Sequence, residues 1–228
     1  MAELTASEAI NARQSRRAFL DTPVSRETVE QLLALASRSP SGSNMQPWNV
    51  YVVMGDKLEE LKAVALKAIA NGVDLGAAEF EIYPAGMSDV HTKRRLRNAE
   101  EMFGAAGVAR DDTAGRMGQM AANFRFFDAP VGMFFSIDRA LAVGNGQMAH
   151  LGMFIQTLML AAQAQGLDTC PQEAWAILHD TVAPWLGIPD EQMLYCGLAL
   201  GHHDPDAPIN SLRTDREPVE SFTTFIGE

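Results

Sequence analysis

The sequence predicts one domain that mixes helices with strands, and three observations carry this prediction. A length of 228 residues suits a single sizeable core, and no linker or internal repeat divides the chain. Apolar side chains recur every three or four residues in several segments, which indicates amphipathic helices. Other short segments are rich in β-branched and aromatic side chains, as buried strands are. We therefore expect a single domain over residues 1–228.

Capping residues and apolar stripes define the expected helices. Thr5 and Glu8 form a capping box at the start of the first helix, and Ser25 caps the second, whose apolar stripe begins at Val29. The later segment Leu151–Ala164 is apolar nearly all round and should be buried on every side. Helices are expected over residues 5–13, 25–39, 57–71, 91–103, 113–124, 145–165 and 180–186.

Strand patterns fall between these helices and at the C-terminus. Buried strands are expected at Asn49–Met54, at Ala129–Ile137 and at Met193–Ala199. The second of these has a proline near its start, a position where proline is tolerated. Two further extended patterns are Glu79–Ala85 and Ser221–Ile226.

The composition excludes several classes of function. The formal net charge is −11, so we expect neither a general nucleic-acid binder nor a protein of anionic membrane surfaces. The opening segment Met1–Ser7 is polar and lacks the apolar core of a signal peptide. The two cysteines, Cys170 and Cys196, lack the spacing of metal ligands. We therefore expect free thiols, no metal site and a cytoplasmic location.

Three polar stretches contain groups that suit a phosphorylated ligand. Arg13–Arg17 brings three guanidinium groups and a hydroxyl together, which suits a phosphate, with a solvated basic turn as the alternative. Ser39–Trp48 joins a helix to a strand, and its prolines and glycine keep it irregular, with hydroxyls, an amide and N–H groups exposed. In Gly166–Trp175 a helix-stopping glycine precedes Pro171, after which a new turn should leave free N–H groups.

These stretches resemble the motifs of the nitroreductase family. Arg13–Arg17 matches its opening Arg-x-Ser-x-Arg signature, and Ser39–Trp48 matches its flavin-binding loop, Ser-Pro-Ser-x-x-Asn-x-Gln-Pro-Trp. Gly166–Ala174 is similar to its Gly-(Val/Leu)-x-x-x-Pro-x-x-(Gly/Ala) stretch, and Arg216–Val219 to its Arg-x-Pro-(Leu/Val) segment. The resemblance spans nearly the whole chain. It implies an α+β fold with a central, mostly antiparallel sheet flanked by helices, in an intertwined homodimer.

The resemblance also implies how FMN is held. Arg13, Ser15 and Arg17 would contact the ribityl phosphate and the flavin edge. Arg216, with Arg213 as the alternative, would complete the phosphate site. Backbone N–H groups of the third stretch would approach flavin N5 and O4. The implied cofactor-binding residues are Arg13, Ser15, Arg17, Ser39, Pro40, Ser41, Asn44, Gln46, Pro171, Gln172, Glu173, Ala174 and Arg216.

The activity that the resemblance implies is a ping-pong oxidoreduction. NADH or NADPH would reduce FMN, and a small electron-poor acceptor, such as a nitroaromatic or a quinone, would then be reduced. Phe124 is the candidate for substrate contact, and no side chain is assigned as a general acid. The alternatives are a dehalogenase, an enoate reductase or a flavin-fragmenting enzyme on the same scaffold, or a non-enzymatic FMN-binding protein.

The stretch Gly144–Ala149 also satisfies the G-x-G-x-x-A pattern of dinucleotide-binding loops. In that fold the glycines follow a strand directly, whereas residues 138–143 intervene here. We therefore expect no Rossmann-type nucleotide site.

Overall fold

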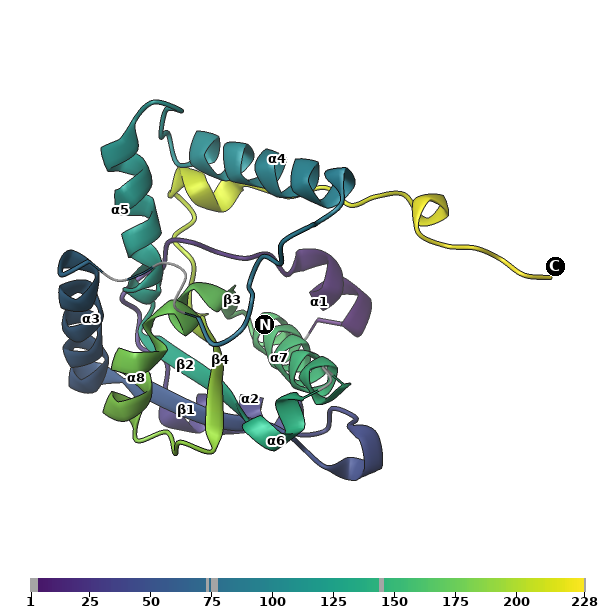
Figure 1. Cartoon of the computed structure of the whole chain (residues 1–228), viewed down its shortest axis with the longest axis horizontal. Coiled ribbons are helices and arrows are strands. Elements are labelled where there is room, and N and C mark those ends of the chain that lie inside the picture. The colour runs from purple at the N-terminus through teal and green to yellow at the C-terminus, as the bar shows by residue number, and fades with distance from the viewer. Residues whose placement is uncertain (1–3, 73, 75–77, 144–145, 228) are drawn as a thin grey trace.

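The computed structural model describes residues 4–72, 74, 78–143 and 146–227, and Figure 1 shows their arrangement. Its α-helices are α1 (Ala6–Ala12), α2 (Arg26–Ala36), α3 (Gly55–Ala70), α4 (Asp89–Ala105), α5 (Thr113–Asn123), α6 (Arg139–Ala142), α7 (Gly146–Ala164) and α8 (His179–Leu186). Its strands are β1 (Asn49–Met54), β2 (Val131–Asp138), β3 (Asp168–Gln172) and β4 (Gln192–Gly201). Short 3-10 helices are η1 (Gly42–Asn44), η2 (Phe126–Asp128), η3 (Glu173–Leu178), η4 (Pro208–Ser211) and η5 (Val219–Ser221).

The four strands form one sheet in the order β1-β2-β4-β3, and every neighbouring pair is antiparallel. Helices lie on both sides of this sheet (Figure 1). The prediction of an α+β fold with a central antiparallel sheet is therefore confirmed. β1 has the predicted bounds, and β2 and β4 lie where strands were expected.

The two faces of the sheet belong to separate hydrophobic clusters, because successive side chains of a strand point to opposite faces. On one face, Phe135 of β2 shares a cluster with Leu32 of α2 and Leu158 of α7. On the other face, Phe134 of β2 shares a cluster with Leu61 of α3. The sheet is thus a middle layer between two hydrophobic clusters.

The helix α4 lies across the top of Figure 1, and the C-terminal segment, in yellow, runs alongside it. Two ion pairs join them. Arg94 Nε lies 3.1 Å from Glu217 Oε1, and Arg97 Nη2 lies 2.6 Å from Asp215 Oδ1. After passing α4 the chain leaves the body as a tail that contains η5, and Phe225 near its end is 82% exposed.

The strand β3 corrects the prediction of a turn at Pro171. Residues 168–172 pair with β4 and form an edge of the sheet. Proline lacks the N–H that a central strand needs, but an edge strand tolerates it where the missing N–H would face away from the sheet. The expected turn begins two residues later, as η3.

Three other expectations differ from the structure. Residues 79–85 contain bends and no strand, and residues 221–226 form no strand within the described chain. The helix α7 is not buried on every side, since Met153 is 45% exposed. Residues 144 and 145, where the helix was expected to begin, lie outside the described residues. Among the described helices, none combines the length and the apolar character needed to cross a bilayer.

Candidate functional site

The arginines expected to hold a phosphate gather around one pocket. This pocket has a volume of about 510 Å³ and lies where the segment after α1 meets α4 and the C-terminal segment. Arg13, Ser15 and Arg17 line it from the N-terminal segment, and Arg213 and Arg216 line it from the C-terminal segment. Residues from opposite ends of the chain therefore meet here, and we call this cavity the phosphate pocket.

Local structure decides which side chains of the N-terminal segment face the phosphate pocket. Ser15 forms a parallel bridge with Thr169 of β3, which keeps the segment extended. Gln14 also lines the pocket, and from Ser15 onward alternate side chains of the extended segment point to opposite sides, so Ser15 and Arg17 both face it. The intervening Arg16 instead places its Nε 3.5 Å from Asp168 Oδ1, and both side chains are largely buried. Arg16 thus points away from the pocket and links the segment to β3.

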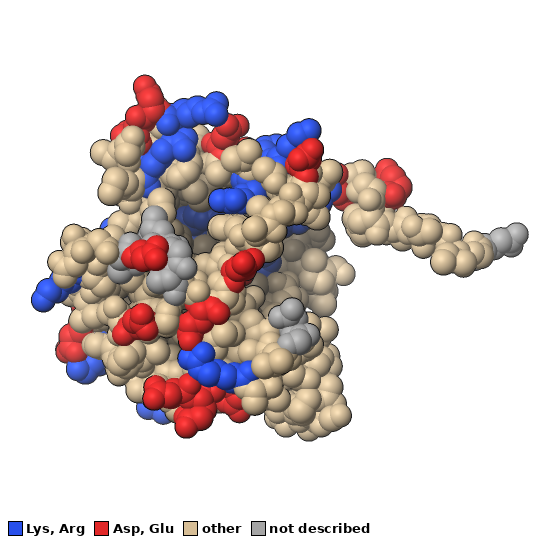
Figure 2. Space-filling model, viewed as in Figure 1, with Lys and Arg blue, Asp and Glu red and all other residues tan. Residues whose placement is uncertain are grey.

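The phosphate pocket is positive although the protein is acidic. Its lining contains four arginines and one carboxylate, that of Asp215, which is already paired with Arg97. Burial lowers the pKa of Arg13, and the neighbouring positive charge of Arg216 lowers this pKa further. Two cations that repel each other at one pocket create a favourable site for an anion. Figure 2 shows blue side chains within the hollow beneath α4.

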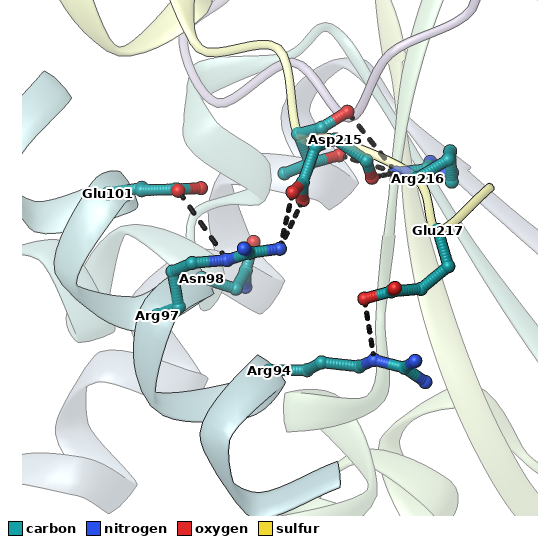
Figure 3. Close-up of a pocket in the computed structure, with 8 residues that line it drawn as sticks. Arg94, Arg97, Asn98, Glu101, Asp215, Arg216 and Glu217 are labelled. Atoms are coloured by element: carbon teal, nitrogen blue, oxygen red, sulfur yellow. Dashed lines mark hydrogen bonds and ion pairs between the residues drawn. The ribbon is translucent and has the colours of Figure 1, made fainter. Parts of the chain in front are cut away.

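Hydrogen bonds distinguish Arg216 from Arg213. Arg213 Nη2 donates to the carbonyl oxygen of Asn11 at 2.8 Å and so holds the end of α1. Arg216 Nη1 donates to Thr214 Oγ1 at 2.9 Å and to the carbonyl oxygen of Asp215 at 2.6 Å, both within its own segment (Figure 3). Among the described residues, no carboxylate lies within ion-pair distance of Arg216. Its charge is therefore available to a ligand.

A second pocket, also of about 510 Å³, lies between α5, α7 and the start of η3. Four expected residues line it together, namely Pro171, Gln172, Glu173 and Ala174. Much of the remaining wall is apolar or aromatic, and it includes Ile82, Tyr83, Met120, Ile155, Ile177 and Tyr195. An apolar wall with a few polar groups at one end suits a planar aromatic ligand, and we call this cavity the ring pocket.

Gln172 lines the ring pocket and also has a buried acceptor without a partner. Its Nε2 donates to the carbonyl oxygen of Asn123 at 2.7 Å, whereas its Oε1 is buried with no hydrogen-bond partner in the described chain. Leaving a buried acceptor unpaired costs about 1–3 kcal/mol. Burial also raises the pKa of the neighbouring Glu173, which disfavours negative charge beside the ring pocket.

Phe124 lies behind the wall of the ring pocket and not in it. Its side chain is only 5% exposed, and its ring packs edge-on against Trp175 with 5.4 Å between the centroids. Met120 and Asn123, from the same helix, line the pocket instead. The sequence did not separate them, because Met120 and Phe124 belong to one helical stripe.

The loop Ser39–Gln46 lies away from both pockets. Figure 1 shows η1, in dark blue between α2 and β1, at the end of the molecule opposite α4. Ser39 Oγ donates to Thr157 Oγ1 of α7 at 2.8 Å, and Ser41 Oγ accepts from the Gln46 N–H at 2.9 Å. The exposed members of the loop include Pro40, Asn44 and Gln46. Within one chain, the structure does not bring these residues to the arginines.

The thiols are unsuited to nucleophilic chemistry. Both Cys170 and Cys196 are free and buried. Burial raises the pKa of Cys170 to about 11 and raises the pKa of Cys196 as well, so both stay protonated near neutral pH. In the described part of the chain, no three His, Cys, Asp or Glu side chains gather as a metal site requires. The side chains at the two pockets can bind and orient a ligand.

Several lining residues carry no signal in the sequence. Tyr83, Met120 and Asn123 line the ring pocket, and Asn98 and Asp215 line the phosphate pocket. They lie in α4, in α5 and in segments whose composition resembles an ordinary polar surface. The sequence nearby contains a basic run at residues 93–97, which by itself indicates a solvated helix face.

An α+β fold with a positive pocket and an apolar pocket suits the class of proteins that bind a phosphorylated aromatic ligand. Comparison with known families agrees with this class, because residues 10–202 match the model of the nitroreductase family. The chain belongs to the nitroreductase family, and the resemblance expected from its motifs is confirmed.

Individual relatives are similar over nearly their full length. The chain is 36% identical to the chloronitrobenzene nitroreductase of Comamonas testosteroni, over 96% of both chains. It is 37% identical to the 4-nitrobenzoate reductase of Pseudomonas putida, over 96% of this chain and 94% of the relative. The crystal structure of the FMN-dependent nitroreductase NfnB from Mycobacterium smegmatis, in complex with NADPH, matches it with a TM-score of 0.91. The sequence identity there is 31%, over 97% of this chain and 98% of NfnB.

Proposed function

We propose that this chain is an FMN-dependent oxidoreductase that uses NADPH or NADH to reduce small electron-poor acceptors, chiefly nitroaromatics and also quinones. The observation that carries the proposal is the pocket in which Arg13, Ser15, Arg17 and Arg216 meet. The names of two relatives point to chloronitrobenzene and 4-nitrobenzoate as the acceptor class. NADPH is the favoured donor, because NfnB binds it.

The phosphate pocket fits the charged end of FMN. A phosphate monoester carries a charge of about −1.5 to −2 at neutral pH, and the lining supplies four arginines against one paired carboxylate. Arg13, Arg17 and Arg216 would donate charge-assisted hydrogen bonds to the phosphate oxygens. The hydroxyl of Ser15 adds a further donor.

The ring pocket fits the isoalloxazine ring. When bound, FMN supplies hydride transfer between the nicotinamide and the acceptor. The first N–H groups of η3, from Glu173 and Ala174, have no partner within that helix. They would donate to the ring edge where negative charge develops on reduction. Met120 and Tyr83 would form the wall against which the acceptor packs.

We place the complete site at the interface of a homodimer. Exposed apolar side chains occur on three neighbouring helices, with Ile10 of α1 at 58%, Leu35 of α2 at 47% and Met153 of α7 at 45%. An exposed apolar surface of this kind favours association. The loop Ser39–Gln46 is fixed on α7 and would reach the partner's flavin across this interface.

The same features bear on location and partners. Two buried free thiols fit a reducing compartment, so we place the enzyme in the cytoplasm. The net charge of −11 argues against a nucleic-acid or anionic-membrane partner.

The proposal is tested by flavin content followed by a steady-state screen. The purified protein should be yellow and should release FMN, not FAD. It should then oxidise NADPH or NADH in the presence of 4-nitrobenzoate, chloronitrobenzene or a quinone. A colourless protein that ignores added FMN would refute the cofactor assignment. Turnover confined to enones would indicate an enoate reductase, and a flavin that neither nicotinamide reduces would indicate a carrier.

A further inference from the structure

We propose that Arg97 is a positioning residue for the phosphate pocket. Arg97 neutralises the carboxylate of Asp215, and this keeps the Arg216 guanidinium available for the FMN phosphate. This inference rests on the proposed FMN function and extends it. Arg97 and Asp215 belong to none of the motifs that predicted the site. The argument depends on where Asp215 lies and on what covers its charge.

Arg97 and Asp215 form a close contact between α4 and the C-terminal segment. Arg97 Nη2 lies 2.6 Å from Oδ1 and 2.5 Å from Oδ2 of Asp215, so one donor spans both carboxylate oxygens. Arg97 Nε also lies 3.8 Å from Glu101 Oε1, one turn further along α4. Figure 3 shows the Arg97 side chain extending from α4 towards Asp215.

Asp215 is placed where an unpaired charge would harm phosphate binding. It directly precedes Arg216 and contributes the one carboxylate among the described residues that line the phosphate pocket. With Asn98 and Thr214 it also lines an adjoining pocket of about 320 Å³ beneath α4. Without a counter-charge, this carboxylate would repel a phosphate dianion and would attract the Arg216 guanidinium away from it.

The acidic residue on the other side of Arg216 is paired in the same way. Arg94 Nε lies 3.1 Å from Glu217 Oε1. Arg94 and Arg97 are three residues apart, so both project from one face of α4. The helix therefore supplies a cation for each acidic neighbour of Arg216, and Arg216 keeps no carboxylate contact within the described chain. Arg97 serves the phosphate pocket directly, because Asp215 lines it and Glu217 does not.

The test compares FMN with riboflavin, which lacks the phosphate, by quenching of flavin fluorescence. Arg97→Gln should weaken FMN binding by about twofold to fivefold at low salt, the upper part of the range expected for a partly exposed charge contact. Riboflavin binding should change by less than about twofold, and added salt should shrink the FMN effect because it screens the unpaired carboxylate. A change in folding alone would affect both flavins alike.

A second variant separates charge neutralisation from a mechanical link between α4 and the tail. Asp215→Asn removes the harmful charge, so it should bind FMN at least as tightly as the wild type. In the Asp215→Asn background, Arg97→Gln should have almost no effect. Arg110→Gln is the matched control, because Arg110 Nη1 lies 3.7 Å from Glu100 Oε1 and lines neither the phosphate pocket nor the adjoining one.

The proposal would be overturned if Asp215→Asn weakened FMN binding as much as Arg97→Gln, since the contact would then act as a link. It would also be overturned if Arg97→Gln lost both flavins equally or lost neither. In those cases the wild type still binds FMN, and the proposed function stands. If the wild type bound neither flavin, the proposed function and this inference would both be refuted.

Discussion

Removing the guanidinium of Arg216 should weaken FMN binding far more than it slows the reaction of bound flavin. Arg216 lines the phosphate pocket and makes hydrogen bonds to Thr214 and Asp215 alone among the described residues. It lies outside the ring pocket, where the hydride would be transferred. Arg216→Ala should therefore purify with little flavin, and excess FMN should restore much of its turnover.

The size of the loss follows from the charge and the exposure of Arg216. A hydrogen bond to a charged group contributes about 1.5–3 kcal/mol. The side chain is exposed in this chain, and solvent screens exposed charges, so we expect the lower end of that range. About 1.5 kcal/mol corresponds to roughly a tenfold rise in the Kd for FMN.

The matched control is Arg213→Ala. Arg213 lines the same pocket, but its Nη2 is engaged with the Asn11 carbonyl oxygen at 2.8 Å. It should therefore lose much less FMN affinity, as measured by flavin fluorescence. If Arg213→Ala loses flavin and Arg216→Ala does not, the assignment of the C-terminal arginine is wrong by three residues. If neither loses flavin, the C-terminal segment does not reach the phosphate.

Three other predictions concern the core, the thiols and the assembly. A β-carbon on Gly197 would lie 2.3 Å from Trp175 Cδ1. Gly197→Ala should therefore lower the free energy of unfolding by about 1–3 kcal/mol, and the Tm should fall by about 2–4 °C for each kcal/mol lost. An unchanged Tm would mean that the indole ring can move aside. Burial raises the pKa of Cys170 from its ordinary value of 9.0 to about 11. The folded protein therefore holds the thiol proton more tightly than the unfolded chain does, so the contribution of Cys170 to folding stability is complete below about pH 9 and is lost as the pH rises towards 11. Disulfide reagents should accordingly label neither cysteine of the native protein at neutral pH, and labelling before unfolding would contradict this burial. The wild type should sediment as a dimer and Met153→Asp as a monomer with weakened FMN binding, whereas a wild-type monomer that holds FMN tightly would contradict the interface.

Local signals explain why most elements could be predicted. Thr5 caps α1 and Glu8 reaches back to it, as the capping box requires, and Ser25 caps α2. The edge strand β3 was missed because a proline such as Pro171 usually indicates a break in secondary structure. The pairing of residues 168–172 with β4 makes this segment a strand. The exposed side of α7 was missed because composition does not show which faces of an apolar helix the rest of the chain covers.

Some residues of the candidate site could be predicted from local motifs, and others depend on contacts between distant parts of the chain. The motifs predicted Arg13, Ser15, Arg17 and Arg216, which the fold brings to one pocket. The contact of Arg97 joins residues 118 positions apart, and both partners look like ordinary surface charges in the sequence. Such pairings depend on the path of the chain, so no local pattern reveals them.

The most direct test of the central claim is an anaerobic double-mixing experiment that follows the absorbance of the bound flavin. NADPH should bleach the flavin in the absence of any acceptor. After the nicotinamide is removed, 4-nitrobenzoate should restore the oxidised spectrum at a rate at least equal to steady-state turnover. If neither NADPH nor NADH bleaches the flavin, or if reduced flavin persists in the presence of nitroaromatics and quinones, the chain is not a nitroreductase.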